Sequence, residues 1–463
     1  MLKVYNSLTR KKHDVIPVNE DGSLRMYTCG PTVYYYAHIG NLRSYLFMDF
    51  LRRVLKFNSY NVLGVMNITD VGHLTSDEDT GDDKMEVSAK RENKSVYEIA
   101  EHYTNFFMKD CARLNIDMPE HVVKATDHVK EMIEIVVALL EKGYAYEISD
   151  GIYFDTAKFP EYGMLSGQTD KQAGARIEVN EEKRNPEDFA LWKKVDPSHI
   201  MKWESPWGLG CPGWHIECSA MSKKYLGNHF DIHTGGIDHL PVHHENEIAQ
   251  NDCLEGHRVV EIWMHGEFLQ VDGGKMSKSL RNLYTIDDLI EKGYSPLDYR
   301  YFCLNTHYHK KLNFTFDGLN AAKTALERLR ALVNSNKGVK RELNAEEIAK
   351  LTKYNIDFTS AVNDDLNIPQ ALGVLWNMLK DLPKSEDVYE LAIKMDSVFG
   401  LDLDKEIAKQ EVEIPEEVIA LAEERKLARA NKDYAKSDEL RDKISELGYA
   451  IKDSATGYEI TKK

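Results

Sequence analysis

Cysteine, histidine and carboxylate side chains lie in four segments of the chain at spacings that suit a metal ion. Histidine is unevenly placed, because eight of the 17 histidines fall within residues 215–265. In that stretch His243 and Glu247 are four positions apart, so one face of a helix can present both side chains. Cys218 and the distant Cys29 would complete four ligands of the kinds that Zn²⁺ prefers. The whole set predicts a zinc site, whereas any one member alone is more typical of a structural histidine or a buried thiol.

Spacing alone leaves the identity of one zinc ligand open. Cys211 lies seven residues before Cys218 and offers the same kind of donor atom. Either cysteine would complete the set.

Two further motifs have the composition of a nucleotide site. The string HIGN contains His38 and Gly40 and lies between a predicted strand and a predicted helix. The N–H groups and the dipole at such a helix start favour a phosphate, to which the histidine can donate a hydrogen bond. The string GGKMSKS at 273–279 places Lys275 and Lys278 three positions apart, so that both can reach one polyphosphate. Each string alone has an ordinary alternative, namely a structural histidine before a helix or a solvated lysine loop.

The elements around these motifs predict an α/β fold with a parallel sheet. Residues 24–29 form a predicted strand, residues 41–57 a helix with two apolar stripes, and residues 60–70 a strand rich in Val and Ile. A strand, a helix and a strand in that order form a βαβ unit, which implies parallel strands. The sheet is expected to resume near 230–233 and 263–269.

We expect three domains along the chain. A Rossmann-like domain over 1–318 contains an insertion at about 112–205, in which a hairpin precedes residues 157–210 that are predicted to be loops. A helical domain follows over 319–405, and a small mixed α/β unit over 406–463 begins with a charged linker.

The composition limits the class of protein. The 463 residues are 42% hydrophobic and 29% charged, as in a globular protein. Six cysteines in so long a chain argue against a disulfide scaffold, and we expect no signal peptide or membrane span and a cytoplasmic location. The net charge of −17 excludes a uniformly basic nucleic-acid binder but not local basic faces, such as 321–341 and 425–436.

The two nucleotide motifs, in this order along one α/β domain, resemble the signature pair of class I aminoacyl-tRNA synthetases. The strings GWHIECSAM, FDIHTGG and HHENE, with Cys29 before HIGN, are more narrowly similar to the cysteinyl-tRNA synthetases. The similarity covers nearly the whole chain, including PEDFALWK at 186–193 and the segment 428–444. It implies that L-cysteine and Mg-ATP form cysteinyl-adenylate, and that the cysteinyl group passes to the 3′ end of tRNA-Cys.

The resemblance also implies roles for individual residues. One zinc ion per chain would be bound by Cys29, Cys218, His243 and Glu247, with Cys211 not a ligand. The substrate thiolate would be a further ligand, and serine a far poorer one. Three residues match positions that line the cysteine pocket of the family, namely Thr69, Trp214 and His233.

The same resemblance extends to ATP and tRNA. His38, Gly40 and Asn41 would hold ATP, with Asn41 where the family usually has histidine, and Lys275 and Lys278 would stabilise the leaving pyrophosphate. The helical and C-terminal domains would contact tRNA, and the protein would be a monomer. The positions implicated in anticodon recognition are Arg429, Asp438 and Asp453.

The sequence departs from the commonest family form in three places. An acidic loop within 72–95 replaces a shorter pattern, and Arg281 follows KMSKS where glycine is usual. Near the C-terminus Tyr458 stands next to the position of a family tryptophan.

Two other functions fit parts of the pattern. A related ligase that joins cysteine to an amino sugar shares the zinc and adenylation motifs, but the long region after Leu319 argues against it. A catalytically inactive, zinc-containing RNA-binding paralogue is the other alternative, and the intact motifs argue against it.

Overall fold

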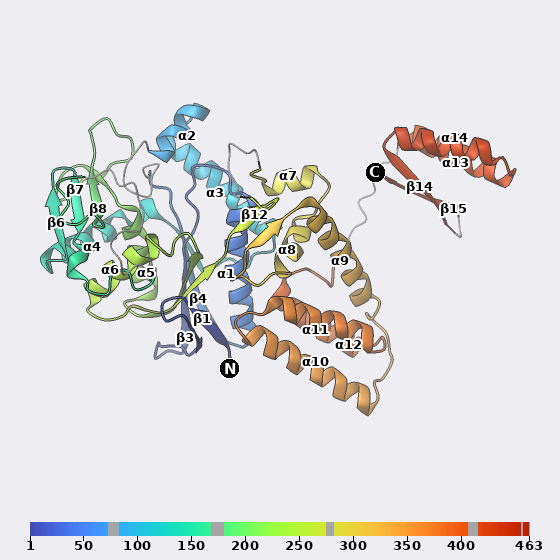
Figure 1. Cartoon of the computed structure of the whole chain (residues 1–463), viewed down its shortest axis with the longest axis horizontal. Helices are drawn as coiled ribbons and strands as arrows, with labels where there is room; N and C mark the ends of the chain where they lie inside the picture. Colours follow the sequence, from blue (N-terminus) through green and yellow to red (C-terminus); the bar gives the residue numbers. More distant parts are fainter. Residues whose placement is uncertain (73–82, 168–179, 275–281, 406–414, 455–456, 463) are drawn as a thin grey trace. The chain divides into compact units, whose positions relative to one another are not determined.

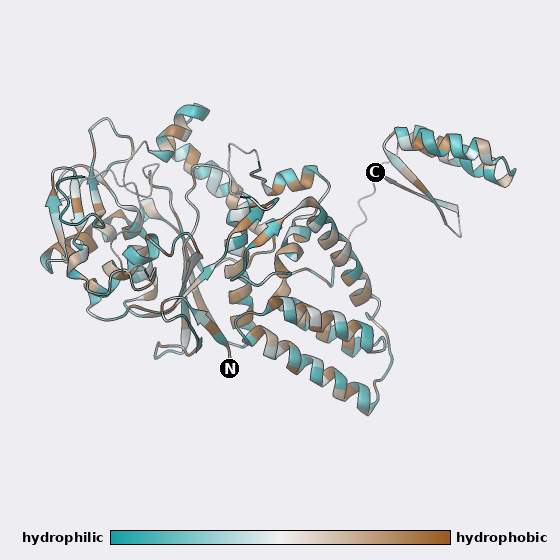
Figure 2. Cartoon of the chain, viewed as in Figure 1, coloured by the Kyte–Doolittle hydropathy of each residue, from teal (hydrophilic) through white to brown (hydrophobic). Residues whose placement is uncertain are grey.

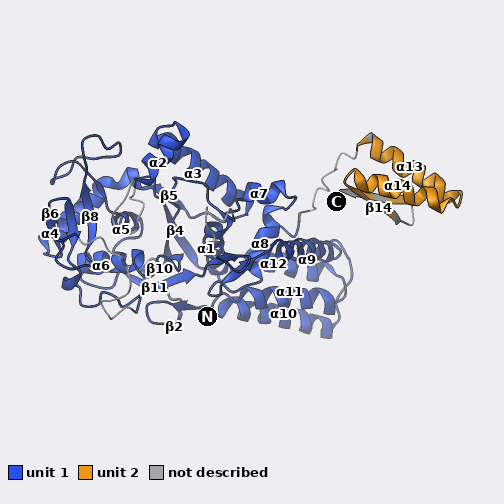
Figure 3. Cartoon of the chain, turned by 45° about the horizontal axis from the view of Figure 1, so that its top comes forward, with its two compact units in different colours: residues 1–404 blue, residues 405–463 orange. Residues whose placement is uncertain are grey.

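The computed structural model forms two compact units, Met1–Asp404 and Lys405–Lys463 (Figure 3). The residues it describes are 1–72, 83–167, 180–274, 282–405, 415–454 and 457–462. Among these residues, no helix is long and apolar enough to span a membrane.

A five-stranded parallel sheet lies at the centre of the first unit, which confirms the predicted α/β class. Its strands are β3 (Ser23–Thr28), β4 (Asn61–Ile68), β5 (His121–Lys124), β10 (Phe230–Gly236) and β11 (Val260–Gly266). Their spatial order is β11-β10-β3-β4-β5, and all four pairings are parallel. From β3 the chain first adds β4 and β5 on one side of the sheet and later adds β10 and β11 on the other side. In such sheets a crevice opens at the carboxyl ends of the strands where the order reverses, here between β3 and β10.

Helices cover both faces of this sheet (Figure 1). On one face lies α1 (Ile39–Phe57), which joins β3 to β4 and buries both of its apolar stripes. The group on the other face comprises α4 (Val129–Glu141), α5 (Trp214–Leu226) and α6 (His243–Glu255). Successive side chains of β3 point to opposite faces, so Met26 belongs to the core with α1 and Tyr27 to the core with α5 and α6. This arrangement places the start of α1 at the same edge of the sheet as Cys29.

The insertion contains a four-stranded antiparallel sheet. Its strands are β6 (Ala145–Ile148), β7 (Gly151–Phe154), β8 (Phe189–Lys194) and β9 (Gly210–Pro212). The predicted hairpin is confirmed, because β6 pairs with β7. The prediction of loops over 157–210 is wrong for β8 and β9. The apolar run in β8 is too short to show an alternating pattern. Its strand conformation is determined by antiparallel pairing with β7.

The remaining elements of the first unit connect these layers. The strands are β1 (Lys3–Asn6), β2 (Lys11–Asp14), β12 (Leu269–Val271) and β13 (Leu312–Phe314). The helices are α2 (Lys84–Glu92), α3 (Val96–Arg113), α7 (Ile286–Glu291) and α8 (Pro296–Leu304), with short 3-10 turns at Ala125–His128 and Thr156–Lys158.

The helical region that the sequence predicts consists of four amphipathic helices (Figure 2). They are α9 (Phe316–Asn334), α10 (Ala345–Asn363), α11 (Ile368–Asp381) and α12 (Glu386–Phe399). They belong to the same compact unit as the sheet, so the division at 318 and 319 into two domains stays a prediction.

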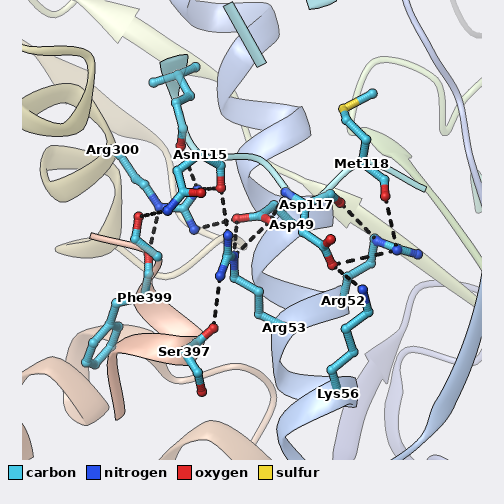
Figure 4. Close-up of polar contacts among 12 residues, drawn as sticks. Asp49, Arg52, Arg53, Lys56, Asn115, Asp117, Met118, Arg300, Ser397 and Phe399 are labelled. Carbon is cyan, nitrogen blue, oxygen red and sulfur yellow. Dashed lines mark hydrogen bonds and ion pairs between the residues drawn. The ribbon is translucent and has the colours of Figure 1, made fainter. Parts of the chain in front are cut away.

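A group of buried hydrogen bonds and ion pairs links α12 to α1 (Figure 4). Asp49 of α1 is fully buried and accepts hydrogen bonds from Arg300 of α8 and from Arg53. Arg300 also donates to the carbonyl of Phe399, at 2.6 Å, and Arg53 donates to the carbonyl of Ser397, at 3.0 Å. The two guanidinium groups thus satisfy carbonyls at the C-terminal end of α12, where the helix dipole favours positive charge.

The second unit is the small mixed structure that the sequence predicts. Helices α13 (Glu416–Ala430) and α14 (Tyr434–Glu446) are followed by an antiparallel pair, β14 (Tyr449–Ser454) and β15 (Gly457–Lys462). Its own core contains Val418, Ala422, Ile444 and Tyr449.

Candidate metal and nucleotide site

A solvent-open cavity of about 420 Å³ lies at the carboxyl ends of β3 and β10, where the strand order reverses. Seven of the predicted site residues line it: Cys29, His38, Asn41, Thr69, Trp214, Cys218 and His243. Residues from four separate segments therefore meet at the edge of the sheet where α/β proteins bind ligands.

The predicted zinc ligands lie together beside this cavity. Cys29, Cys218, His243 and Glu247 each offer one donor atom, and these atoms lie within 4.8 Å of one another. The Sγ atom of Cys218 is 3.8 Å from that of Cys29 and 3.5 Å from Nε2 of His243. His243 Nε2 is 3.0 Å from Glu247 Oε1, as expected for residues one helical turn apart.

Backbone geometry at two glycines makes this convergence possible. A Cβ atom on Gly30 would lie 1.6 Å from the carbonyl oxygen of Asn67, so only glycine lets the segment after β3 approach β4 this closely. A Cβ atom on Gly235 of β10 would lie 2.5 Å from the ring of His244. The glycines therefore make room for the cluster.

Burial controls the protonation of the cluster. It raises the pKa of Cys29, with the neighbouring Cys218 adding to the effect, and it raises the pKa of Glu247. It lowers the pKa of His233 and of His244, so both imidazoles are neutral. Ionising a buried thiol and a buried carboxyl costs free energy, which a bound cation would offset. Neutral imidazole, thiolate and carboxylate are the donors that zinc prefers.

An orphaned oxygen in the cluster also fits a cation. Glu247 Oε2 is fully buried and has no hydrogen-bond donor among the residues that the structure describes. Buried carboxylates of this kind are usually paired or coordinate a metal. The residues present therefore suit a zinc ion.

A second group of possible ligands overlaps the first. Cys29 and Glu247 combine with His233 and His244, and the four donor atoms also lie within 4.8 Å of one another. His233 does not line the cavity, and its ring stacks on Trp263 with centroids 4.3 Å apart. The sequence reasoning missed His244, although the string HHENE offers it as the neighbour of His243.

Three contacts shape the cavity wall next to the predicted zinc ligands. Thr69 donates its hydroxyl hydrogen to Glu217, at 2.7 Å, and accepts one from Asn67, at 2.9 Å. The Trp214 ring lies 4.3 Å from the His243 ring, centroid to centroid. Glu217 is a further site residue that spacing did not reveal, because its importance depends on the contact with Thr69.

The start of α1 forms the other end of the cavity. His38 is the N-cap, and its Nδ1 accepts the N–H of Asn41 at 3.2 Å while Asn41 Oδ1 accepts the N–H of His38. Burial lowers the pKa of His38 to about 4, so the ring is neutral at neutral pH. Because Nδ1 accepts a hydrogen bond, the ring hydrogen belongs on Nε2, which can donate to a ligand. Gly40 lies in the first turn of the same helix.

The remaining predicted residues lie elsewhere. Lys275, Lys278 and Arg281 lie outside the residues that the structure describes. Cys211 is in β9, and neither group of possible metal ligands among the described residues includes it.

The predicted tRNA-binding residues belong to the second unit. Arg429 is an exposed residue of α13, and Asp438 is an exposed residue of α14 that lies 3.3 Å from Arg441. Asp453 is in β14. The predicted tRNA-binding residues therefore belong to the second unit, whereas the cavity residues belong to the first.

Two family profiles match the chain. One, described as the catalytic domain of class I (C) tRNA synthetases, matches residues 15–324. The other, described as the anticodon binding domain of cysteinyl-tRNA ligase, matches residues 411–460.

Curated relatives match the chain over almost its whole length. The cysteine–tRNA ligase of Treponema denticola is 44% identical over 484 aligned residues, which cover 98% of each chain. The cysteine–tRNA ligase 1 of Burkholderia lata is 45% identical and covers 99% of this chain and 96% of its own.

Solved structures of more distant proteins share the fold. Methionyl-tRNA synthetase of Mycobacterium tuberculosis, bound to methionyl-adenylate, matches with a TM-score of 0.59 and 14% identity over 82% of this chain and 88% of its own. The LeuRS of Agrobacterium radiobacter K84, in a ternary complex with tRNA and LeuAMS, matches with a TM-score of 0.63 and 11% identity over 83% and 85%.

Proposed function

The chain belongs to the cysteine–tRNA ligase family of class I tRNA synthetases, and we propose that it activates L-cysteine with ATP and transfers the cysteinyl group to tRNA-Cys. The observation that carries the proposal is that Cys29, Cys218 and His243 share one cavity with the capped start of α1. A thiol-binding centre and a phosphate-binding helix start are the two parts that cysteine activation requires.

We propose that Cys29, Cys218, His243 and Glu247 hold one zinc ion. When bound, zinc would supply an open coordination position that prefers the thiolate of cysteine to the hydroxyl of serine. Trp214 and Thr69 would confine the substrate beside this position. His233 lies behind the cluster, which supports a role in orienting ligands rather than in contacting the substrate.

In the first step the ionised carboxylate of cysteine attacks the α-phosphorus of Mg-ATP. One oxygen–phosphorus bond forms, the bond to the β-phosphate breaks, and pyrophosphate leaves with its magnesium. No general base is needed, because the attacking carboxylate carries no proton. His38 would donate from Nε2 to a phosphate oxygen, and the N–H groups near Gly40 and Asn41 would face the phosphate charge. Lys275 and Lys278 are proposed from the sequence to stabilise pyrophosphate.

In the second step a ribose hydroxyl at the 3′ end of the tRNA attacks the acyl carbon and forms an ester bond, the bond from that carbon to the AMP phosphate breaks, and the hydroxyl proton passes to solvent as AMP leaves. We propose that the second unit recognises the anticodon through Arg429, Asp438 and Asp453. The profile match at 411–460 supports this proposal. A monomeric state and a cytoplasmic location follow from the family resemblance alone and stay predictions.

The anticodon profile also bears on the two alternative functions. A cysteine–amino-sugar ligase would not need such a domain, and a full-length match to cysteine–tRNA ligases argues against it. A non-catalytic RNA-binding paralogue would not need the cavity.

The test is cysteine-dependent exchange of pyrophosphate into ATP, run with cysteine and serine side by side on zinc-loaded protein. We expect exchange with cysteine and almost none with serine, followed by aminoacylation of tRNA-Cys and no ligation to an amino sugar. Absence of exchange would refute the enzyme function, and ligation to the sugar would favour the first alternative.

A further inference from the structure

We propose that the cluster contains a second, deeper position for the same metal ion, bounded by Cys29, His233, His244 and Glu247. The two positions share Cys29 and Glu247 and differ in their other two ligands. This inference rests on the proposed function only in requiring a bound divalent metal, and it does not depend on the substrate.

Distances in the deep group are those of a zinc site. Cys29 Sγ lies 3.2 Å from His244 Nε2 and 3.4 Å from His233 Nε2. It lies 3.7 Å from Glu247 Oε1. The Glu247 carboxylate lies 3.6 Å from His233 Nε2 and 4.0 Å from His244 Nε2. A tetrahedron with zinc–ligand bonds of about 2.0–2.3 Å has edges of about 3.3–3.8 Å. The five distances, from 3.2 to 4.0 Å, bracket this range, so the deep group is close to the size that zinc needs.

Depth distinguishes the two positions. Cys218 and His243, the ligands found only in the outer group, line the cavity, whereas His233 and His244 do not. The side chains of His233, His244 and Glu247 are all 0% exposed. An ion at the deep position would therefore be withdrawn from a substrate in the cavity.

His244 is held by hydrogen bonds of the kind that support metal ligands. Its Nδ1 lies 2.8 Å from Nε2 of His265, whose own Nδ1 lies 2.7 Å from the hydroxyl of Ser7. A hydrogen on Nδ1 of His244 leaves the Nε2 lone pair directed at Cys29. Such partners fix the tautomer and the ring orientation of a metal-binding histidine.

Charge is balanced more closely at the deep position, whereas the outer position offers more soft ligands. Two thiolates and a carboxylate carry one more negative charge than Zn²⁺ neutralises. One thiolate, one carboxylate and two neutral imidazoles balance the ion, and burial of a neutral complex costs less free energy. The two thiolates of the outer position bind zinc more strongly as soft ligands, and substrate sulfur adds a third. We therefore expect the ion at the outer position when all of its ligands are present, and at the deep position when Cys218 or His243 is removed.

The test uses cobalt(II) as the metal, because sulfur-to-cobalt absorption reports how many thiolates are bound. Each purified full-length variant is loaded with cobalt, its metal content is measured, and its spectrum is recorded. Cys218→Ser is expected to keep about one ion per chain with about half of the wild-type thiolate absorption, because only Cys29 remains. His244→Asn alone should keep the ion and the absorption of two thiolates. The double variant Cys218→Ser/His244→Asn should lose the ion.

His243→Asn repeats the test by removing the other ligand unique to the outer group, so the result does not depend on one variant that might fail to fold. Circular dichroism and thermal unfolding check that each variant is folded. Folded Cys218→Ser and His243→Asn proteins that bind no cobalt would overturn the deep position. So would a double variant that binds cobalt as tightly as Cys218→Ser. Lack of exchange activity in the wild-type protein would instead refute the proposed function and leave these metal measurements valid.

Discussion

The sulfur atoms of Cys29 and Cys218 lie 3.8 Å apart, although 189 positions separate the two residues in the chain. Cys29 directly follows β3, and Cys218 lies in the second turn of α5, which packs against β3 and β4. Cys211 is held in the antiparallel sheet of the insertion, where it is paired with Lys193. The fold thus separates two cysteines that are only seven residues apart in sequence.

Replacement of Cys211 is expected to leave the metal content unchanged, because this residue is in neither group of possible ligands. Cys211→Ser should contain the same amount of zinc as the wild-type protein, measured by mass spectrometry of purified protein. Glu247→Gln should reduce zinc content, because Glu247 belongs to both groups. Loss of zinc from Cys211→Ser with retention in Glu247→Gln would contradict the ligand assignment.

Substitutions of His38 should separate its capping role from its role toward phosphate. Asparagine can accept the Asn41 N–H as an N-cap but lacks the Nε2 donor, so His38→Asn should keep stability within about 0.5 kcal/mol and lose roughly 10²-fold in exchange rate. His38→Ala loses the cap as well and should cost about 1 kcal/mol more, measured by urea unfolding. Equal exchange rates for His38→Asn and the wild type would exclude the phosphate role.

The lowered pKa of His38 predicts a pH dependence of stability. The folded protein holds His38 neutral down to about pH 4, whereas in the unfolded chain the imidazole takes up its proton near the ordinary histidine pKa of 6.5. The stability that depends on neutral His38 is present above pH 6.5 and is lost as pH falls toward 4. Urea unfolding between pH 7.5 and 4.5 should therefore show a steeper decline for the wild type than for His38→Asn, and parallel declines would contradict this cause.

The Trp214 ring should contribute to cysteine binding. It lines the cavity and lies 4.3 Å from the His243 ring, centroid to centroid. Trp214→Ala is expected to raise the KM for cysteine in the exchange assay by roughly tenfold, which corresponds to about 1.4 kcal/mol. Trp207→Ala is the control, because Trp207 packs near Trp192 in the insertion and is not part of the cavity lining. An unchanged KM in Trp214→Ala would remove this residue from the pocket.

The basic stretches of α9 and of the second unit predict salt-dependent binding of tRNA. Arg328 is exposed and is a suitable test residue, as is Lys432. Arg330 is not, because its guanidinium donates to the carbonyl of Leu401 at 2.7 Å and supports the fold. Arg328→Gln with Lys432→Gln should weaken tRNA binding and reduce the salt slope by about 0.7–0.9 per lost phosphate contact, while exchange activity stays unchanged. Lys130→Gln, in α4, is the control and should change neither the affinity for tRNA nor the salt slope.

Much of this architecture could be predicted because local patterns and global fold agree. The two apolar stripes over 41–57 require a helix buried on both sides, and α1 is such a helix. Its start at Ile39 was missed by two residues, because the His38–Asn41 capping box depends on side-chain geometry that spacing does not reveal. The short strands β5 and β8 were missed because pairing, rather than periodicity, determines them.

The candidate site was less predictable where contacts are long-range. Convergence of Cys29 and Cys218 came from family resemblance, since nothing local in either segment indicates the other. His244 differs from His243 by one position, and only the fold shows that the two rings belong to different groups of possible ligands. Asp49 and Arg300 have no local signature at all, because charged residues in helices are usually exposed.

The Asp49–Arg300 pair should be among the most stabilising contacts between α1 and α8. Both side chains are 0% exposed, and Arg300 also donates to the carbonyls of Phe399 and Leu114. Arg300→Met removes one partner and leaves Asp49 buried with less compensation, so we expect a loss of about 3–5 kcal/mol in the free energy of unfolding. Urea unfolding of the purified full-length protein measures this change.

Lys56→Met provides the matched control for that experiment, because Lys56 lies on α1, the same helix as Asp49. It forms an ion pair with Asp117 at 2.5 Å, and its side chain is 44% exposed. An exposed pair of this kind contributes at most about 1 kcal/mol. Gly400→Ala tests the packing independently, because its Cβ would lie 2.5 Å from a nitrogen of Arg300 at a residue with φ of 63°. Both the clash and the left-handed backbone predict destabilisation. If Arg300→Met proved no more destabilising than Lys56→Met, the contacts of Arg300 would not be what holds α12 against α1.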